Sequence, residues 1–346
     1  MSSLPFKFSY SLYQTPRQLC DFKMISIGQS LIPFSLIAAT TAVNFDVLNG
    51  QDFPDPGLLQ VGGVSYAFGT ASGPGSIPKT SNNAFNNPGG WSSAVESFPQ
   101  DSPAQSAGGW AKPYTSWAPD VFQLSDGSFA MYYASEINGN GRQPHCLGLA
   151  RNGNDPNGPY TDGSSYSFIC PADQGGAIDP EAFVDDDGSL YLAYKIDCPF
   201  SGNGPCAGTQ SDTPIMLQPL QADGYTFNGE ATEIYNSYNG GYQGIEAPAL
   251  IKHDGIYFLF YSVGCYANNG YRVDYVTSNY RLGPYGNPRT LLQTGDFGLF
   301  GPGGLDVVPG TLQATFHSLK QSNNVDAGRQ INTAELTING DTVTVN

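Results

Sequence analysis

Apolar and polar positions alternate along this chain in short runs, and each run ends at glycine, proline or aspartate. Alternation with a period of two is typical of half-buried β-strands, and glycine-centred turns between such runs indicate hairpins. After position 43, no stretch of ten or more residues keeps the spacing of an amphipathic helix without a Gly, Pro or β-branched interruption. We therefore expect an all-β fold with very little helix.

One phrase recurs five times: an acidic or proline-flanked start, an apolar strand, a glycine-centred turn and a second strand rich in Tyr and Phe. The copies read DPGLLQVGGVSYAFGT from Asp55, APDVFQLSDGSFAMYYAS from Ala118, DPEAFVDDDGSLYLAYK from Asp179, EAPALIKHDGIYFLFYS from Glu246 and, more weakly, LDVVPGTLQATFHSL from Leu305. The prolines near the first four starts are 63, 61 and 68 residues apart. This period suits one four-stranded sheet per repeat, so the sequence predicts a five-bladed β-propeller.

The composition agrees with this fold. The chain has 346 residues, which exceeds the roughly 250 to 300 that one core usually supports. A propeller, however, grows by adding blades around a channel. Gly (43), Pro (26), Tyr (21) and Phe (20) are abundant while charged residues make up 13%, as many short strands and turns require.

Residues 1–42 have the features of a leader and are excluded from the predicted fold. Lys23 precedes an internal Met24, an apolar core follows from Leu31 to Ala39, and small residues continue to Ala42. This order matches a secretory signal that begins at Met24, and the apolar run is far shorter than the ~20 residues of a membrane span. We expect a secreted, extracellular protein whose residues 43–346 form one catalytic propeller domain.

Net charge limits the class of partner. The full chain carries −16, and the segment after residue 42 keeps 11 basic and 29 acidic residues, a net charge of −18. Such an acidic surface repels nucleic acid and anionic membranes and favours an uncharged substrate such as a neutral sugar. Acidity also keeps secreted proteins soluble, so it does not by itself identify a ligand. We expect a monomer that binds polysaccharide or oligosaccharide.

Five cysteines follow the leader, which in a secreted chain indicates up to two disulfides and one odd thiol. We predict the pairs Cys146–Cys170 and Cys206–Cys265, with Cys198–Cys206 as the local alternative. Their spacing does not match a zinc site.

Three repeat starts carry a carboxylate: Asp55, Asp179 and Glu246. An Asp before Pro can simply accept hydrogen bonds at a strand start. The repeat itself does not demand acid, because Trp117 and Gly304 lie near the corresponding places of the second and fifth copies. Radial repetition brings matching strands to one axis, so we expect the three acids to converge.

Converging carboxylates suit the cleavage of a glycosidic bond with inversion. One carboxylate acts as general base on water, and one protonated carboxyl acts as general acid on the leaving oxygen, ~6.5 to 9.5 Å away. A third acid close to the proton donor raises its pKa and keeps it protonated near neutral pH.

The segments DFPDPGLL, WAPDVFQL, GGAIDPEAFVDDDGSLYLAY, IEAPALI and FGPGGLDV, in this order from about Gln51 to Leu319, resemble glycoside hydrolase family 43. These enzymes are inverting five-bladed propellers that act on arabinan, arabinoxylan and xylan. The resemblance implies that Asp55 is the general base, Asp179 the acid that tunes and orients the donor, and Glu246 the general acid. It also places Trp117 by the substrate, where its indole would stack on a sugar; a packed aromatic is the alternative.

One departure concerns the cofactor. Many members of the family have a His after Gly-Pro-Gly in the last blade, often associated with a central calcium ion, and here that position is Gly304. We therefore expect no cofactor and assign no metal ligand. The run Asp185-Asp186-Asp187-Gly188 lacks the spacing of a calcium loop and is interpreted as a hairpin turn.

The leading functional hypothesis is release of L-arabinofuranosyl units from arabinan or arabinoxylan, as an exo-arabinanase or arabinofuranosidase. A β-xylosidase or xylan-active enzyme of the same fold is the alternative, because loop shape sets sugar choice. A carbohydrate-binding propeller without catalysis is the rival from another class. The motif at Asn154-Asp155-Pro156-Asn157-Gly158 matches the nucleophile of retaining invertase-like propellers, but it lies in a turn-rich segment and is interpreted as a surface loop.

Overall fold

A computed structural model describes residues 42–72, 76–99, 103–106, 108–197, 214–236 and 244–346. Contacts divide the chain into Met1–Thr40 and a compact unit from Thr41 to Asn346. The predicted leader lies almost entirely outside the described residues and stays a prediction. In the described part of the chain, no helix has the length and apolar character that a membrane crossing needs.

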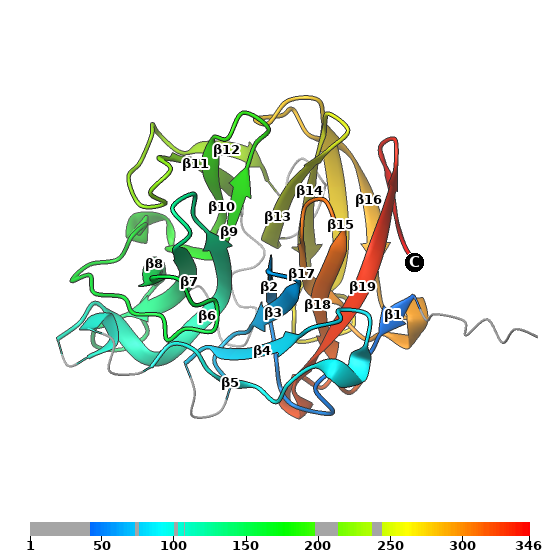
Figure 1. Cartoon of the computed structure of the whole chain (residues 1–346), viewed down its shortest axis with the longest axis horizontal. Helices are drawn as coiled ribbons and strands as arrows, with labels where there is room; N and C mark the ends of the chain where they lie inside the picture. Colours follow the sequence, from blue (N-terminus) through cyan, green and yellow to red (C-terminus); the bar gives the residue numbers. More distant parts are fainter. Residues whose placement is uncertain (1–41, 73–75, 100–102, 107, 198–213, 237–243) are drawn as a thin grey trace, which may run out of the picture. The chain divides into compact units, whose positions relative to one another are not determined.

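The compact unit contains five antiparallel sheets in chain order, which confirms the predicted five-bladed β-propeller (Figure 1). Described helices are single 3₁₀ turns, for example η3 (Ala172–Gln174) and η4 (Asp296–Gly298). Blade 1 consists of β2 (Gly57–Val61), β3 (Val64–Phe68), β4 (Pro78–Asn82) and β5 (Val95–Glu96), and blade 2 of β6 (Ala111–Gln123), β7 (Phe129–Ile137) and β8 (His145–Asn152). Blade 3 consists of β9 (Ala177–Val184), β10 (Leu190–Ile196), β11 (Ile215–Leu220) and β12 (Thr232–Tyr235). Blade 4 consists of β13 (Ile245–His253), β14 (Ile256–Val263), β15 (Arg272–Ser278) and β16 (Gly286–Leu292).

The fifth blade joins the two ends of the unit. It contains β17 (Gly303–Val307), β18 (Gln313–Leu319) and β19 (Arg329–Asn339), with β20 (Thr342–Val345) paired to β19. The first described strand, β1 (Val43–Asn44), adds to β19 with Val43 opposite Ala334. Blade 5 is therefore completed by residues from the start of the unit, which closes the ring.

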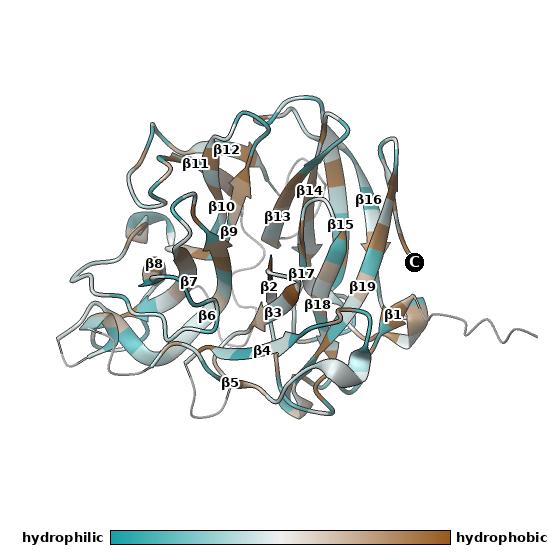
Figure 2. Cartoon of the chain, viewed as in Figure 1, coloured by the Kyte–Doolittle hydropathy of each residue, from teal (hydrophilic) through white to brown (hydrophobic). Residues whose placement is uncertain are grey.

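Apolar side chains fill the spaces between neighbouring blades. Each of the five buried clusters combines residues of two adjacent blades; Phe258 and Phe316, for example, share the cluster between blades 4 and 5. Figure 2 shows the apolar residues concentrated along the strands. The core is thus a set of blade interfaces around a central channel, and this leaves the channel free for polar groups.

Each blade has one sharply turned residue beside the channel, which lies within the inner strand in four blades and two residues before β2 in blade 1. All five have a positive φ of between 40° and 59°, and four of them are not glycine: Asp55, Ala118, Asp179, Ala247 and Gly304. For a residue other than glycine this conformation costs about 1–3 kcal/mol, so the surrounding structure must hold it. Glycine is needed nearby at Gly57, where a Cβ atom would lie 2.1 Å from the carbonyl oxygen of Pro119 in the next blade.

Hydrogen bonds between blades hold these turns. At every junction a backbone N–H of one blade donates to a side-chain oxygen of its neighbour. The five donor–acceptor pairs are Ala118 to Thr70 (2.8 Å), Ala182 to Asp120 (2.8 Å), Ala247 to Asp179 (2.8 Å), Gly304 to Ser262 (2.9 Å) and Leu58 to Asp306 (2.5 Å). Three of these acceptors are carboxylates of inner strands, Asp120, Asp179 and Asp306. The same side chains therefore stabilise the ring and lie at its channel.

Candidate active site

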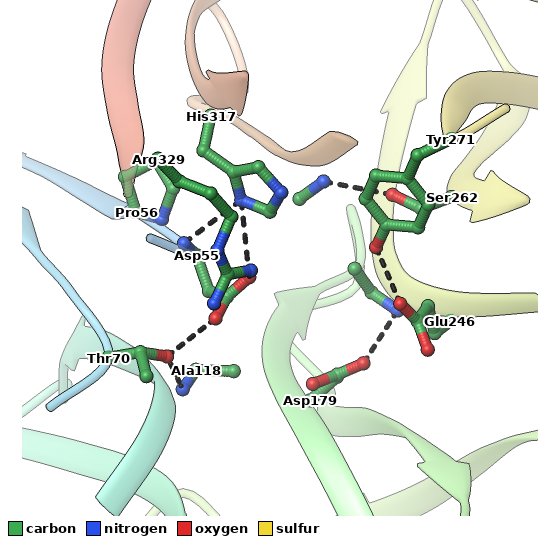
Figure 3. Close-up of polar contacts among 12 residues, drawn as sticks. Asp55, Pro56, Thr70, Ala118, Asp179, Glu246, Ser262, Tyr271, His317 and Arg329 are labelled. Atoms are coloured by element: carbon green, nitrogen blue, oxygen red, sulfur yellow. Dashed lines mark hydrogen bonds and ion pairs between the residues drawn. The ribbon is translucent and has the colours of Figure 1, made fainter. Parts of the chain in front are cut away.

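The three predicted acids lie close together at the centre of the ring (Figure 3). Asp55 lies two residues before β2, Asp179 lies in β9 and Glu246 lies in β13. Asp179 interacts electrostatically with both of the others. The central pocket is lined by Asp55 and Asp179 together with the turn residues Ala247 and Gly304. We call Asp55, Asp179 and Glu246 the active-site acids.

The structure corrects one detail of the repeat alignment. Asp55 and Asp179 occupy equivalent turn positions with positive φ, whereas the equivalent residue of blade 4 is Ala247. Glu246 is one residue earlier, at the place that Trp117 holds in blade 2. The register irregularity between Glu246 and Ala249 is not special to this blade, because the inner strands of blades 2, 3 and 5 have one at the corresponding place. The third acid reaches the hub from a different backbone position because the glutamate stands one residue earlier in the sequence.

Asp55 is held in the ionised form. Arg329 Nη1 lies 3.0 Å from Oδ1, His317 Nδ1 lies 3.2 Å from the same oxygen, and the hydroxyl of Thr70 donates to Oδ2 at 2.6 Å. Burial alone would raise the pKa of Asp55, but Arg329, His317 and Thr70 together hold it below its ordinary value. This carboxylate is a ready proton acceptor.

Asp179 has the opposite environment. Burial, followed by the negative charge of Glu246, raises the pKa of Asp179 to about 8, although Lys195 acts in the other direction. The backbone N–H of Ala247 donates to its Oδ2 at 2.8 Å. Asp179 therefore keeps a proton near neutral pH next to Glu246.

Glu246 receives a donor at each carboxylate oxygen. Lys195 Nζ lies 3.1 Å from Oε2, and the hydroxyl of Tyr271 donates to Oε1 at 2.7 Å. Tyr271 also hydrogen-bonds with Ser262, which accepts from the backbone N–H of Gly304. Lys195 on β10 and Tyr271, which directly precedes β15, therefore fix the side chain. An ionised Asp55 thus faces an acid side on which Asp179 keeps a proton beside Glu246, and acid–base cleavage of a glycosidic bond requires such a contrast.

A second set of carboxyls lies deeper in the channel. Asp120, Glu181 and Asp306 follow the turn residues by two positions, and one carboxylate oxygen of each lies within 4.8 Å of the others. Burial raises the pKa of Asp120 to about 8 and that of Asp306 to about 6, and burial with Asp306 raises the pKa of Glu181. Glu181 and Asp306 are hydrogen-bonded. We call these three the channel acids; their spacing could hold a cation, and we assign no ion.

The site fits no metal ligand at position 304. Gly304 has a φ of +59°, and a Cβ atom there would lie 2.9 Å from His317 Nδ1. His317 occupies this space from β18, fully buried, with its ring parallel to that of Tyr271. Burial and Arg329 lower the pKa of His317, so the ring is neutral beside Asp55. A histidine at 304 would collide with His317, and no step below involves a metal.

Trp117 lies in β6 directly before the turn residue Ala118. Its side chain is 37% exposed, and its indole stacks on the imidazole of His145 with 3.6 Å between ring centroids. His145 is buried, and burial followed by the charges of Arg142 and Lys112 lowers its pKa to about 3. A neutral ring thus supports one face of Trp117, and the partly exposed indole remains a predicted sugar platform.

The remaining sequence predictions have mixed outcomes. The Cys146–Cys170 disulfide is present. Cys265 is also disulfide-bonded, but Cys198 and Cys206 lie outside the described residues, so its predicted pairing stays a prediction. Asp185–Gly188 is the hairpin turn between β9 and β10, closed by a hydrogen bond from the N–H of Asp185 to the carbonyl of Ser189. Residues 154–158 form a turn on exposed surface, as predicted.

Several site residues were not predicted. The active-site acids are contacted from the second and later strands of the blades, or from residues next to those strands, by Thr70, Lys195, Tyr271, His317 and Arg329. Lys195 had a usable signal, because it is the one charged residue in the otherwise uncharged strand β10. The channel acids had a signal too, since Asp120 and Glu181 lie two residues, and Asp306 one residue, after a repeat start.

Comparisons with known proteins agree with this geometry. The sequence profile of the family described as glycosyl hydrolases family 43 matches residues 47–343. An extracellular endo-α-(1→5)-L-arabinanase of Bacillus subtilis is 25% identical over 323 residues, which cover 86% of this chain and 90% of that enzyme. A β-D-galactofuranosidase of Aspergillus niger is 31% identical over 161 residues, which cover 44% of this chain and 42% of that enzyme.

Solved structures share the fold. A thermostable family-43 glycoside hydrolase superposes with a TM-score of 0.68 at 23% identity, over 85% of this chain and 92% of that one. An endo-arabinanase of Bacillus licheniformis superposes with a TM-score of 0.63 at 23% identity, over 85% and 97%. At these identities the likeness concerns the propeller itself.

Proposed function

Because this chain belongs to glycosyl hydrolases family 43 and is a glycoside hydrolase, we propose that it is a secreted, inverting enzyme that releases L-arabinofuranosyl units from arabinan or arabinoxylan. One observation carries the reaction type. Arg329 keeps Asp55 ionised on one side of the hub, while Asp179 keeps a proton beside Glu246 on the other. Inversion needs one carboxylate and one carboxylic acid at the same time.

In this proposal Asp55 takes a proton from water as the water attacks the anomeric carbon. Glu246 gives its proton to the leaving oxygen as the glycosidic C–O bond breaks. Asp179, the neighbouring carboxyl, tunes the proton donor and orients the chain at Ala247 through the hydrogen bond between their blades. Trp117, supported by His145, would stack on a sugar ring next to the acids.

The names of the relatives support the proposed substrate sugar and the proposed secretion. The enzymes of Bacillus subtilis and of Thermotoga petrophila are named extracellular endo-α-(1→5)-L-arabinanases, and that of Cellvibrio japonicus an extracellular exo-α-(1→5)-L-arabinofuranosidase. Secretion also agrees with the predicted leader and with the Cys146–Cys170 disulfide. We propose a monomer that needs no second subunit for its site.

A β-D-galactofuranosidase activity is the second candidate, because the relative of that name has the higher identity of the two sequences compared above. A β-D-galactofuranosyl ring matches the α-L-arabinofuranosyl ring and differs by a longer exocyclic chain, so one pocket could accept both. Xylan-active members of the fold make a β-D-xyloside the third.

The test is a panel of aryl α-L-arabinofuranoside, aryl β-D-galactofuranoside, aryl β-D-xyloside and debranched arabinan. Product chain length separates release of single units from internal cleavage, and NMR of the first-formed sugar gives its anomeric form. We expect the arabinofuranoside to be cleaved with inversion. Retention of configuration would exclude the proposed mechanism, and polymer binding without product would favour the lectin alternative.

A further inference from the structure

Lys195 is a buried cation at the candidate active site. Its side chain is 3% exposed in β10, with Nζ at 3.1 Å from Glu246 Oε2 and 3.6 Å from Asp197 Oδ1. Removing an ammonium group from water is costly unless nearby charge compensates for it. A lysine at this position therefore has a strong electrostatic effect on whatever carboxyl it contacts.

The contacts favour the carboxylate form of Glu246. Lys195 reaches one oxygen and the hydroxyl of Tyr271 the other. Ser262 and the N–H of Gly304 continue this chain behind Tyr271, which fixes the direction of its hydroxyl. Donors to both oxygens stabilise an anion more than a neutral acid. The site is thus built for the state that a general acid reaches after it has given up its proton.

We propose that Lys195 is a positioning residue for proton transfer, stabilising the Glu246 carboxylate that forms when the proton passes to the leaving oxygen. This inference rests on the proposed function. The proton leaves Glu246, the C–O bond breaks with its electron pair on the leaving oxygen, and that oxygen takes the proton. Water supplies the new C–O bond and gives its own proton to Asp55.

Other charges face the same acid. Asp179 on β9 is a second carboxyl beside Glu246, and Asp197 directly after β10 partly offsets Lys195. Across the hub, Asp55 is neutralised by Arg329 on β19, while His317 on β18 is uncharged. Lys195 therefore provides positive charge on the acid side of the site. Its loss should make release of the Glu246 proton less favourable, and loss of Asp197 should make that release more favourable.

The test compares Lys195→Met, Lys195→Arg and the control Lys252→Met in full-length enzyme. Lys252 is also ion-paired, to Asp185 and Asp186, at the blade 3 and 4 hairpins. For Lys195→Met we expect the alkaline limb of the pH profile of kcat/KM to move to higher pH by about one to three pH units. Turnover of substrates with poor leaving groups should fall roughly tenfold, with little loss on activated aryl glycosides. Arg should restore most of the wild-type profile, and Lys252→Met should keep it.

Asp197→Asn supplies a second, opposite test that does not depend on the folding of Lys195→Met. We expect its alkaline limb to move to lower pH. Unchanged alkaline limbs in both Lys195→Met and Asp197→Asn, in folded enzyme, would overturn the inference. This outcome differs from failure of the proposed function, in which wild-type enzyme would cleave none of the glycosides in the panel.

Discussion

The active-site acids and the channel acids are two sets of three carboxyls in the same channel, and in blade 3 the two sets are only two residues apart, at Asp179 and Glu181. In the first set, Asp55 is ion-paired with Arg329 and Glu246 with Lys195. Among the ion pairs of the described residues, none involves Asp120, Glu181 or Asp306. Their pKa values are raised instead, chiefly by burial.

The difference teaches that the position of a carboxyl in a propeller hub does not determine whether the carboxyl is charged. The presence of a neighbouring cation determines it. Asp55 and Asp179 have equivalent backbone conformations, yet the pKa of one is lowered and that of the other is raised. A repeated backbone brings acids together, and unrepeated residues on outer strands, such as Arg329, divide them into base and acid.

The largest effect is expected from replacing the active-site acids separately. Asp55→Asn should lower kcat by about 10²–10⁴-fold on every substrate, because water must always be deprotonated. Glu246→Ala should cause a loss of that size only on arabinan and other poor leaving groups, since an activated aryl glycoside barely needs an acid. Steady-state kinetics on both substrate types measure the contrast.

Equal losses for both variants on both substrates would contradict the division of roles. Circular dichroism and Tm of each variant establish that the propeller is intact. A surface substitution of the same chemical kind, Glu233→Gln on β12, serves as the control and should keep wild-type rates.

The second-largest effect is expected from replacing Arg329, the cation beside the proposed general base Asp55. Arg329→Gln removes the guanidinium beside Asp55, so the pKa of that carboxyl should rise toward its ordinary value or above it, because burial remains. The base then loses its ionised form at higher pH. We expect the acidic limb of kcat/KM to move up by about one pH unit or more.

Arg289→Gln is the matched control, because Arg289 pairs with Asp341 near the end of the chain, away from the channel. It should leave the pH profile unchanged. An Arg329→Gln profile identical to wild type would show that Arg329 does not set the charge of Asp55.

The smallest effect is expected from the channel acids. Their folded-state pKa values lie above the ordinary value of about 4, so the folded protein binds more protons than the unfolded chain between pH ~4 and ~8. Stability from these groups is therefore present at low pH and lost as the pH rises through that window. Glu181→Gln should reduce the fall in Tm between pH 5 and pH 8 by about 2–4 °C.

Thermal unfolding in buffer with EDTA measures this effect without interference from stray cations. The activity of Glu181→Gln near pH 5 should stay close to wild type. A steeper fall in Tm for the variant would mean that the channel acids are ionised in the folded protein.

Much of the fold was predictable because propellers repeat. Pro56, Pro119, Pro180 and Pro248 recur at nearly regular spacing, and each copy carries a complete hairpin pattern. The closure by β1 was not predictable, since the two residues Val43 and Asn44 carry no strand pattern of their own. The three-stranded second blade was equally hidden, because strand count depends on pairing between distant residues.

The candidate site was predictable in part. Asp55, Asp179 and Glu246 stood at repeat starts, where radial symmetry brings them together. Thr70 and Arg329 could not be assigned, because a threonine after an apolar strand and an arginine before one are common, and only the folded ring places them on Asp55.

The most direct test of the account is a carboxyl ¹³C NMR titration of enzyme labelled at aspartate, with Asp55→Asn and Asp179→Asn used for assignment. The account predicts that the Asp55 resonance stays that of a carboxylate from pH 4 upward, while the Asp179 resonance changes near pH 8. Two resonances that titrate together near pH 4 would contradict it.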